Sequence, residues 1–387
     1  MVCQMEGNSK VSGGGENGSS SDGRPPNPLN AAYRNCFSSS RVSSTCRKTL
    51  VRHPSLGSAT IAVKTPEIPI EPLTMIEGET EFLPVVRSGA WTDIGIRSSM
   101  EDVYVCVDDF TTQYGLEHIT EVPNAFYGIF DGHGGKHAAD FACCHIPQYI
   151  SEDEDFPREI ERVITSAFLQ TDNAFAEACS LDAGLASGTT ALTALVLGRS
   201  LVVANAGDCR AVLCRKGEAI EMSRDHKPHG LREKKRIEAC GGYVDDGYLN
   251  GQLNVARALG DWHMEGMKGN PDGGPLTAEP ELMTMELTEE DEFLIMGCDG
   301  LWDVFRSENA VDFARRKLQE HNDPVMCCRD LVEEALKRKS GDNLSVVVVC
   351  FQPNPPPNLI APRGQVHRSI SAEGLRELQS FLDGLES

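Results

Sequence analysis

The chain has 387 residues, of which 40% are hydrophobic, so it can bury the core of one large domain with tails or of two ordinary domains. Its 58 acidic residues outnumber its 36 basic residues, for a formal net charge of −22. This charge argues against nucleic acid as a partner, because nonspecific binding to nucleic acid relies on a basic surface. No apolar run is long enough for a membrane span, so none is expected.

Residues 1–81 are predicted to form a disordered N-terminal tail rich in Ser, Gly and Pro. Residues 24–64 hold seven basic and no acidic side chains, a composition found in transit peptides. Because Glu6, Glu16 and Asp22 precede this stretch, a regulatory tail is favoured over organellar targeting. The 14 cysteines show no CxxC spacing and are interpreted as reduced thiols. Reduced thiols favour a location of the protein in the cytoplasm or the nucleus.

Residues 82–352 are predicted to form one domain of antiparallel sheets flanked by helices, because short apolar runs often follow one another directly. Strands are predicted over residues 102–107, 125–130, 189–197, 201–206, 210–214, 293–298 and 344–351. Apolar residues at helical spacing predict helices over residues 136–150, 158–180, 231–240, 307–319 and 325–337.

Residues 353–387 are predicted to be a proline-rich linker followed by a short amphipathic helix. Leu375, Leu378, Leu382 and Leu385 would share one face of this helix. Such a face packs on the domain or binds a partner, and packing is the default expectation.

Acidic residues at the ends of apolar strands are the most informative pattern. Asp131 and Asp299 each follow an apolar run, and Asp342 precedes one. One such aspartate usually forms a turn, but three of them, with Glu101 and Asp102 opening a further strand, predict a carboxylate cluster. Carboxylates 4 Å apart repel by about 4 kcal/mol at an effective dielectric constant of 20, so the cluster needs cations.

Those cations are expected to be Mg²⁺ or Mn²⁺, because the converging ligands are oxygens. His133 and His137 form an HxxxH pattern, but two glycines lie between them and disfavour a helical zinc pair. The absence of a GxxxxGK[ST] motif excludes a nucleotide P-loop.

Eight short motifs together carry a resemblance to a known family. They are RSSMED (97–102), FDGHGG (130–135), SGTT (187–190), ANAGD (204–208), DHKP (225–228), ARALGD (256–261), GCDGLWD (297–303) and DN (342–343). In this order they resemble the metal-dependent type 2C protein phosphatases (PPM family), plant branch, over about residues 86–352. The resemblance implies an α+β fold, a sandwich of two antiparallel β-sheets flanked by α-helices.

The resemblance also implies an activity. The enzyme would hydrolyse phosphoserine and phosphothreonine on proteins with a hydroxide that bridges two Mg²⁺ or Mn²⁺ ions, without a phospho-enzyme. Phosphorylated proteins and the kinases that make them would be its partners, and we expect a monomer. Residues 241–255 lack the tryptophan with which the plant hormone branch docks on the abscisic-acid receptor, so that partner is not expected.

The matching positions imply roles for individual residues. The metal ligands would be Asp131, which bridges the two ions, the carbonyl of Gly132, Asp299, Asp342 and Glu101. Asp102 would support these ligands by hydrogen bonding. Arg97 would bind the substrate phosphate with its planar guanidinium, and His133 would be the general acid.

Some of these roles have simpler alternatives. Asp208 and Asp303 match positions of a weaker third metal, but each could cap a local turn. Arg97 could be an ordinary surface cation and His133 a hydrogen-bonded turn histidine. For the whole domain, one alternative is a catalytically inactive phosphoprotein-binding module of the same fold. Another is a metal-dependent nuclease, which the acidic charge disfavours.

Overall fold

The computed structural model describes residues 82–120, 122–269 and 273–358. The predicted N-terminal tail and the predicted C-terminal helix lie outside the described residues. The named elements run from Arg87 to Cys350, within the predicted domain, whose exact limits stay a prediction.

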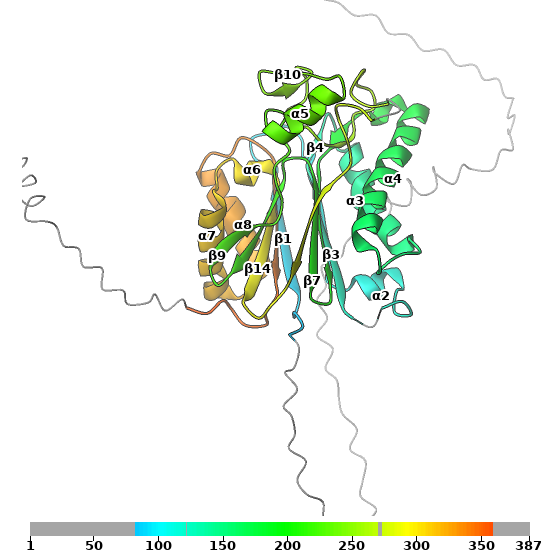
Figure 1. Cartoon of the computed structure of the whole chain (residues 1–387). Coiled ribbons are helices and arrows are strands. Elements are labelled where there is room, and N and C mark those ends of the chain that lie inside the picture. The colour runs from blue at the N-terminus through cyan, green and yellow to red at the C-terminus, as the bar shows by residue number, and fades with distance from the viewer. Residues whose placement is uncertain (1–81, 121, 270–272, 359–387) are drawn as a thin grey trace, which may run out of the picture. The chain divides into compact units, whose positions relative to one another are not determined.

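The centre of the molecule is a sandwich of two five-stranded antiparallel sheets (Figure 1). One sheet has the order β1-β15-β14-β8-β9, with strands Arg87–Asp93, Leu344–Cys350, Asp291–Gly297, Arg210–Arg215 and Glu218–Glu221. The other sheet has the order β13-β7-β6-β3-β2, with strands Glu281–Glu286, Ser200–Ala206, Ala191–Leu197, Asn124–Phe130 and Val103–Val107.

Two pairs of helices cover the outer faces of the sandwich (Figure 1). Helices α3 (His137–Glu152) and α4 (Ile160–Leu181) pack on the sheet that contains β3. Helices α7 (Ser307–His321) and α8 (Pro324–Lys337) pack on the sheet that contains β14. The four layers confirm the predicted α+β fold.

The core follows from the alternation of side chains along strands that are buried on both faces. In β14, Phe293 and Ile295 join the apolar cluster under α7 and α8, whereas Leu294 and Met296 join the cluster between the sheets. Because both faces are apolar, the strand reads as one continuous hydrophobic run.

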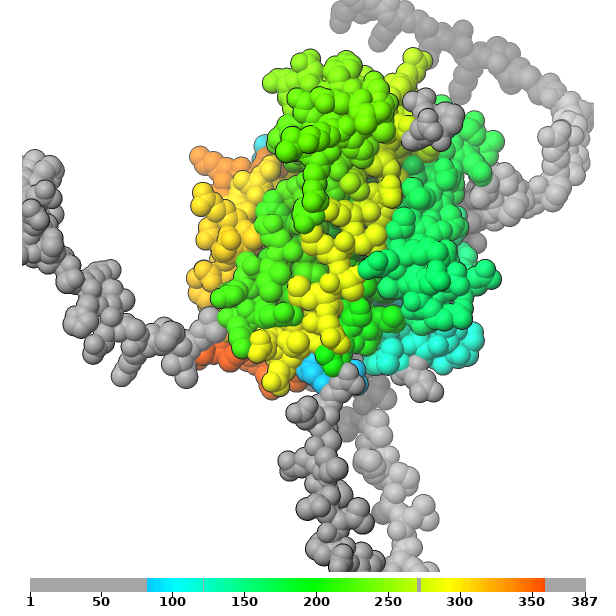
Figure 2. Space-filling view, viewed as in Figure 1, coloured from blue at the N-terminus to red at the C-terminus, as the bar shows by residue number. Residues whose placement is uncertain are grey.

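Several short elements lie at one end of the sandwich, whereas α2 (Phe110–Tyr114) lies at the other end (Figure 1). Helix α5 (Leu231–Ala239) and the hairpin β10–β11 (Val244–Asp245 and Tyr248–Leu249) form a lobe at the end opposite α2, which projects in Figure 2. The remaining short elements are the 3-10 helix η1 (Ala183–Leu185), α6 (Asp299–Trp302) and the small sheet β12-β5-β4 (Leu259–Gly260, Gly188–Thr189, Gly132–His133).

The predicted strands and helices are present, with ends shifted by a few residues, but β1, β9 and β13 of the two main sheets were not predicted. Strand β1 contains Gly89, where a Cβ atom would lie 2.3 Å from the backbone nitrogen of Val325 in α8. The close approach of the helix requires this glycine, which also weakens the strand pattern in the sequence. Strand β13 lies at a sheet edge and is incompletely buried.

Two further predictions concern the described part of the chain. Its cysteines form no disulfide bond. None of its helices combines the length and the apolar character needed to cross a membrane.

Candidate metal centre

The predicted acidic residues meet at one end of the sandwich because its strands are antiparallel. Strands β3, β7 and β14 end at this edge, whereas β2, β8 and β15 begin there. The turns at this edge therefore collect acids from distant parts of the sequence, namely Asp102, Asp131, Asp208, Asp299 and Asp342.

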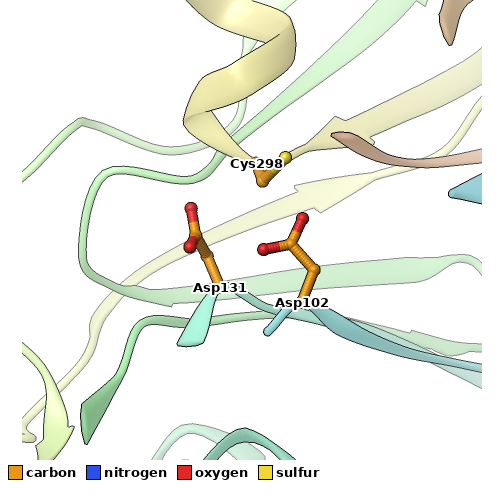
Figure 3. A group of neighbouring side chains, drawn as sticks. All are labelled: Asp102, Asp131 and Cys298. Carbon is orange, nitrogen blue, oxygen red and sulfur yellow. The ribbon is translucent and has the colours of Figure 1, made fainter. Parts of the chain in front are cut away.

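Two groups of side chains are close enough to share a cation. Asp131, Asp208 and Asp299 each place a carboxylate oxygen within 4.8 Å of the others. Asp102, Asp131 and Cys298 form a second such group, and Figure 3 shows the two carboxylates beside the cysteine at the start of α6. Asp131 belongs to both groups and is therefore central to the arrangement.

The cluster is electrostatically unfavourable for its own carboxylates. Burial, together with the charges of Asp102 and Asp299, raises the pKa of Asp131 well above its usual range. Burial and the neighbouring Asp208 raise the pKa of Asp299 to about 7. Because such repulsion is relieved by cations, the cluster is suited to binding them.

The donor atoms fit a hard divalent cation. Oδ2 of the buried Asp102 has no hydrogen-bond partner among the described residues. The thiol of Cys298 is already bonded, because it donates to the carbonyl of Asn343 (3.4 Å) and accepts from the N–H of Ser345 (3.2 Å). Burial raises the pKa of Cys298 well above its usual range. Oxygen ligands therefore remain, which Mg²⁺ and Mn²⁺ prefer.

The backbone of Asp131 is fixed by two threonines. The Oγ1 of Thr189 (3.1 Å) and the N–H of Thr190 (2.9 Å) donate to the carbonyl of Asp131, and the N–H of Asp131 donates to Oγ1 of Thr190 (3.2 Å). The next residue, Gly132, lies so close to Glu101 that a Cβ atom would be 2.5 Å from the Glu101 carbonyl oxygen. The role of these threonines as a clamp was not predicted from the sequence.

Asn343 holds the loop that carries two predicted site residues. Its Oδ1 accepts from the N–H of Glu101 (2.8 Å), and its Nδ2 donates to the carbonyls of Ile94 and Ser99 (both 3.0 Å). The loop between Ile94 and Ser99 contains Arg97. The sequence places Asn343 in a motif beside Asp342, but nothing in the motif indicates these three bonds.

Arg97 and Glu101 lie at the rim of the centre. Arg97, whose side chain is 58% exposed, donates from Nη2 to Oδ2 of Asp342 (2.7 Å). Glu101 accepts from the hydroxyl of Ser99 (3.0 Å) and the N–H of Gly135 (3.3 Å). Neither Glu101 nor Asp342 belongs to the two close groups, although the charge of Asp342 contributes to the raised pKa of Asp131.

His133 is paired with a buried acid, Asp261, which is the last residue of the motif ARALGD. The Nε2 of His133 lies 2.8 Å from Oδ2 of Asp261, which is 1% exposed. Burial alone would lower the pKa of His133, but the hydrogen bond and charge of Asp261 raise it above the usual value. The backbone N–H of Asp261 in turn donates to the carbonyl of Ser187 (2.9 Å).

The two acids predicted for a third ion are placed differently. Asp208 lies within the close group of Asp131 and Asp299, whereas Asp303 lies at the end of α6 and outside that group. Lys227 forms an ion pair with Asp208, and its Nζ lies 3.8 Å from Oδ2 of Asp299. This lysine was not singled out from the sequence.

The chain is similar to known proteins over most of its length. A family model described as protein phosphatase 2C matches residues 90–344. The probable protein phosphatase 2C 22 of Arabidopsis thaliana is 66% identical over 384 residues, which are 96% of this chain and 97% of the relative. The probable protein phosphatase 2C 57 of Oryza sativa subsp. japonica is 72% identical over 304 residues, which are 79% of this chain and 83% of the relative.

Among solved structures, a serine-threonine phosphatase 2C from Toxoplasma gondii has a TM-score of 0.59 at 21% identity and covers 70% of this chain and 98% of its own. A Caenorhabditis elegans sex determining protein has a TM-score of 0.61 at 24% identity and covers 70% of this chain and 65% of its own. At these identities the two structures support the fold alone.

The family matched over residues 90–344 is metal-dependent, and its substrates are phosphoproteins. The carboxylate groups around Asp131 could hold such metals. The family model covers most of the chain, and two plant relatives share well over half of the aligned residues. The chain therefore belongs to the protein phosphatase 2C family, in its plant-type branch, and is a protein serine/threonine phosphatase.

Proposed function

We propose that the enzyme hydrolyses phosphoserine and phosphothreonine by direct attack of water activated between two divalent cations, without a phospho-enzyme. The observation that carries this proposal is the group formed by Asp131, Asp208 and Asp299, whose carboxylate oxygens lie within 4.8 Å of one another. Bound Mg²⁺ or Mn²⁺ would supply the activated water and neutralise charge on the phosphate. The protein would supply the ligands, the substrate contacts and a proton.

The proposed ligands are the strand-end acids. Asp131 takes the bridging position, which its membership of both close groups supports. The other ligands are Asp299, Asp342, Glu101 and the carbonyl of Gly132. Asp102 supports the ligands by hydrogen bonding, and Asp208 and Asp303 hold a weaker third ion.

Two residues act on the substrate in this proposal. Arg97 binds the phosphate, since its fork of N–H donors matches phosphate oxygens and its exposed side chain is accessible to a protein substrate. His133 gives a proton to the departing serine or threonine oxygen, which is otherwise a poor leaving group. Its pairing with Asp261 supports this role, because the carboxylate stabilises the protonated ring.

The test is release of phosphate from a phosphothreonine peptide by metal-free enzyme to which Mg²⁺ or Mn²⁺ is added back. Activity should appear with either ion and vanish in EDTA, and full activity in verified absence of metal would contradict the proposal. An inactive phosphoprotein-binding module would bind the peptide without turnover. Cleavage of a phosphodiester in preference to the peptide would indicate a nuclease.

A second measurement tests the role of His133. Changing His133→Ala should slow hydrolysis of the peptide by roughly 10²–10⁴-fold. The loss should be much smaller with p-nitrophenyl phosphate, whose leaving group needs no proton. Equal losses with both substrates would contradict general-acid catalysis.

We further propose that the enzyme acts as a monomer in the cytoplasm or nucleus on proteins that kinases have phosphorylated. The substrates themselves can be identified by trapping. An Asp299→Asn variant that binds phosphoproteins without hydrolysing them would retain them on a column, whereas a dephosphorylated lysate should yield none.

A further inference from the structure

Lys227 places a positive charge inside the acidic cluster. Its ammonium group forms an ion pair with Asp208 and lies 3.8 Å from Oδ2 of Asp299. The side chain of Asp208 is 3% exposed, whereas that of Lys227 is 24% exposed. The lysine therefore reaches the carboxylates from the solvent side of the cluster.

The backbone around Lys227 is fixed to the turn that carries Asp208. The N–H of His226 donates to the carbonyl of Gly207 (2.9 Å), and Nδ1 of His226 accepts from the N–H of Gly207 (3.2 Å). Nδ2 of Asn205 donates to the carbonyl of Arg224 (2.9 Å). Pro228 follows Lys227 and restricts its backbone to extended conformations. The lysine and the acid are thus held as one unit.

We propose that Lys227 is a built-in counter-ion of Asp208 that competes with a divalent cation for this carboxylate. The inference rests on the proposed metal-dependent function. An ammonium and a divalent ion on the same carboxylate repel each other, so binding of the ion requires Lys227 to move away. The compact charge and flexible stem of lysine permit this movement into solvent.

The competition would make the cation position at Asp208 weaker than the position at Asp131. Asp131 is surrounded by the charges of Asp102, Asp299, Asp208 and Asp342. For Asp208, in contrast, burial raises the pKa but the charge and hydrogen bond of Lys227 oppose this rise. Repulsion at Asp131 would be relieved mainly by bound metal, whereas repulsion at Asp208 is already partly relieved by Lys227.

Lys268 offers a matched control, because it is a second lysine that is paired with a buried aspartate, Asp172. Its Nζ lies 2.8 Å from both carboxylate oxygens of Asp172 and 2.9 Å from the carbonyl of Ala258. Asp172 also accepts from Nε1 of Trp262 (3.0 Å). Asp172 belongs to neither of the two close groups. Removal of Lys268 therefore tests the effect of losing a paired lysine outside those groups.

The experiment is a titration of the metal-free full chain with Mn²⁺. Binding is measured by calorimetry and, independently, by the electron paramagnetic resonance signal of the free ion. Lys227→Met should tighten the weakest Mn²⁺ binding step by roughly ten- to a hundredfold, the usual size of effects next to metal ligands. Lys227→Arg, which keeps the charge, and Lys268→Met should leave this step unchanged.

Nuclear magnetic resonance of the wild-type chain keeps the test independent of whether Lys227→Met folds. In protein labelled with ¹⁵N-lysine, the ammonium signal of Lys227 is identified as the one that is missing from the spectrum of Lys227→Arg. Addition of Mg²⁺ to the wild-type chain should shift this signal. An unmoved signal, or equal Mn²⁺ binding by wild type and Lys227→Met, would overturn the role of Lys227 alone. Absence of Mn²⁺ binding in every variant would instead overturn the proposed metal centre and this inference with it.

Discussion

Acidic side chains lie at both ends of strand β14, but their surroundings differ. At its start, the completely buried Asp291 pairs with Arg215 (2.8 Å), and Glu292 pairs with Arg315 (2.6 Å). Beyond its other end, Asp299 lies among carboxylates, and burial together with Asp208 raises its pKa to about 7. One strand thus joins an end where each buried acid has its own arginine to an end where the acids outnumber the nearby cation, Lys227.

The two ends of β14 contribute differently, the first to the stability of the fold and the second to the candidate metal centre. A buried acid paired with an arginine is satisfied within the fold, and at the start of β14 Arg315 also donates to the carbonyl of Pro357 and fastens the chain after β15. Acids that repel one another lower the stability of the folded state unless a cation arrives. Perturbed acids of this kind mark a functional site.

The largest expected effect comes from Asp131→Asn, which removes the central acid of the cluster. Activity should fall by several orders of magnitude, because the position shared by both close groups loses its charge. The melting temperature in EDTA should stay the same or rise, because one source of repulsion is removed. Turnover and the melting temperature are measured on the same sample. Persistent activity with a lowered melting temperature would contradict a role of Asp131 in metal binding.

At the start of β14, Glu292→Gln should lower the free energy of unfolding by about 3 kcal/mol, because it leaves the charge of Arg315 buried without its partner. Activity per folded molecule should be retained. Urea denaturation measures the loss. The double variant Glu292→Leu with Arg315→Met serves as the control, because removal of both charges should restore much of the stability.

A smaller effect should appear when the pH is varied without metal. The folded protein holds a proton on Asp299 up to about pH 7, whereas this carboxyl has an ordinary value of 3.8. Between these values the folded state binds more protons than the unfolded state, so the free energy of unfolding should rise as the pH falls, at up to about 1.4 kcal/mol per pH unit for one proton. Urea denaturation in EDTA measures the slope, and Asp299→Asn should reduce it.

The smallest effect is expected for Glu290→Gln, two residues before Glu292. Glu290 pairs with Lys216, but their side chains are 43% and 65% exposed. Exposed ion pairs contribute little, so the free energy of unfolding should change by less than about 1 kcal/mol. If this variant were as unstable as Glu292→Gln under the same urea titration, burial would not explain the contrast between them.

The sequence predicts the strands best where β-branched residues follow one another, as in Val346–Val349 of β15. Prediction from the sequence fails where a strand residue is required for packing against another element. Gly89 in β1 is an example, because its missing side chain makes room for α8. For the site, strand-end position was sufficient to select Asp131 and Asp299, because antiparallel strands bring their ends to a common edge.

The partners of these acids could not be predicted in the same way. Thr190, Asn343 and Lys227 each act through contacts between segments far apart in the sequence. Such contacts depend on the conformation of turns, and no periodicity encodes them. The close approach of Asp208 to Asp131 has the same origin, since it depends on the turn between β7 and β8.

The cluster draws its acids from both layers of the sandwich, and this has a mechanical consequence. Asp131 follows a strand of one sheet, whereas Asp299 and Asp342 flank strands of the other. The apolar contacts that pack the two sheets together are non-directional. A shared cation would be a cross-link between the layers, so amide hydrogens of β3 and β14 near the cluster should exchange together, slowly when the ion is bound and faster once it has left.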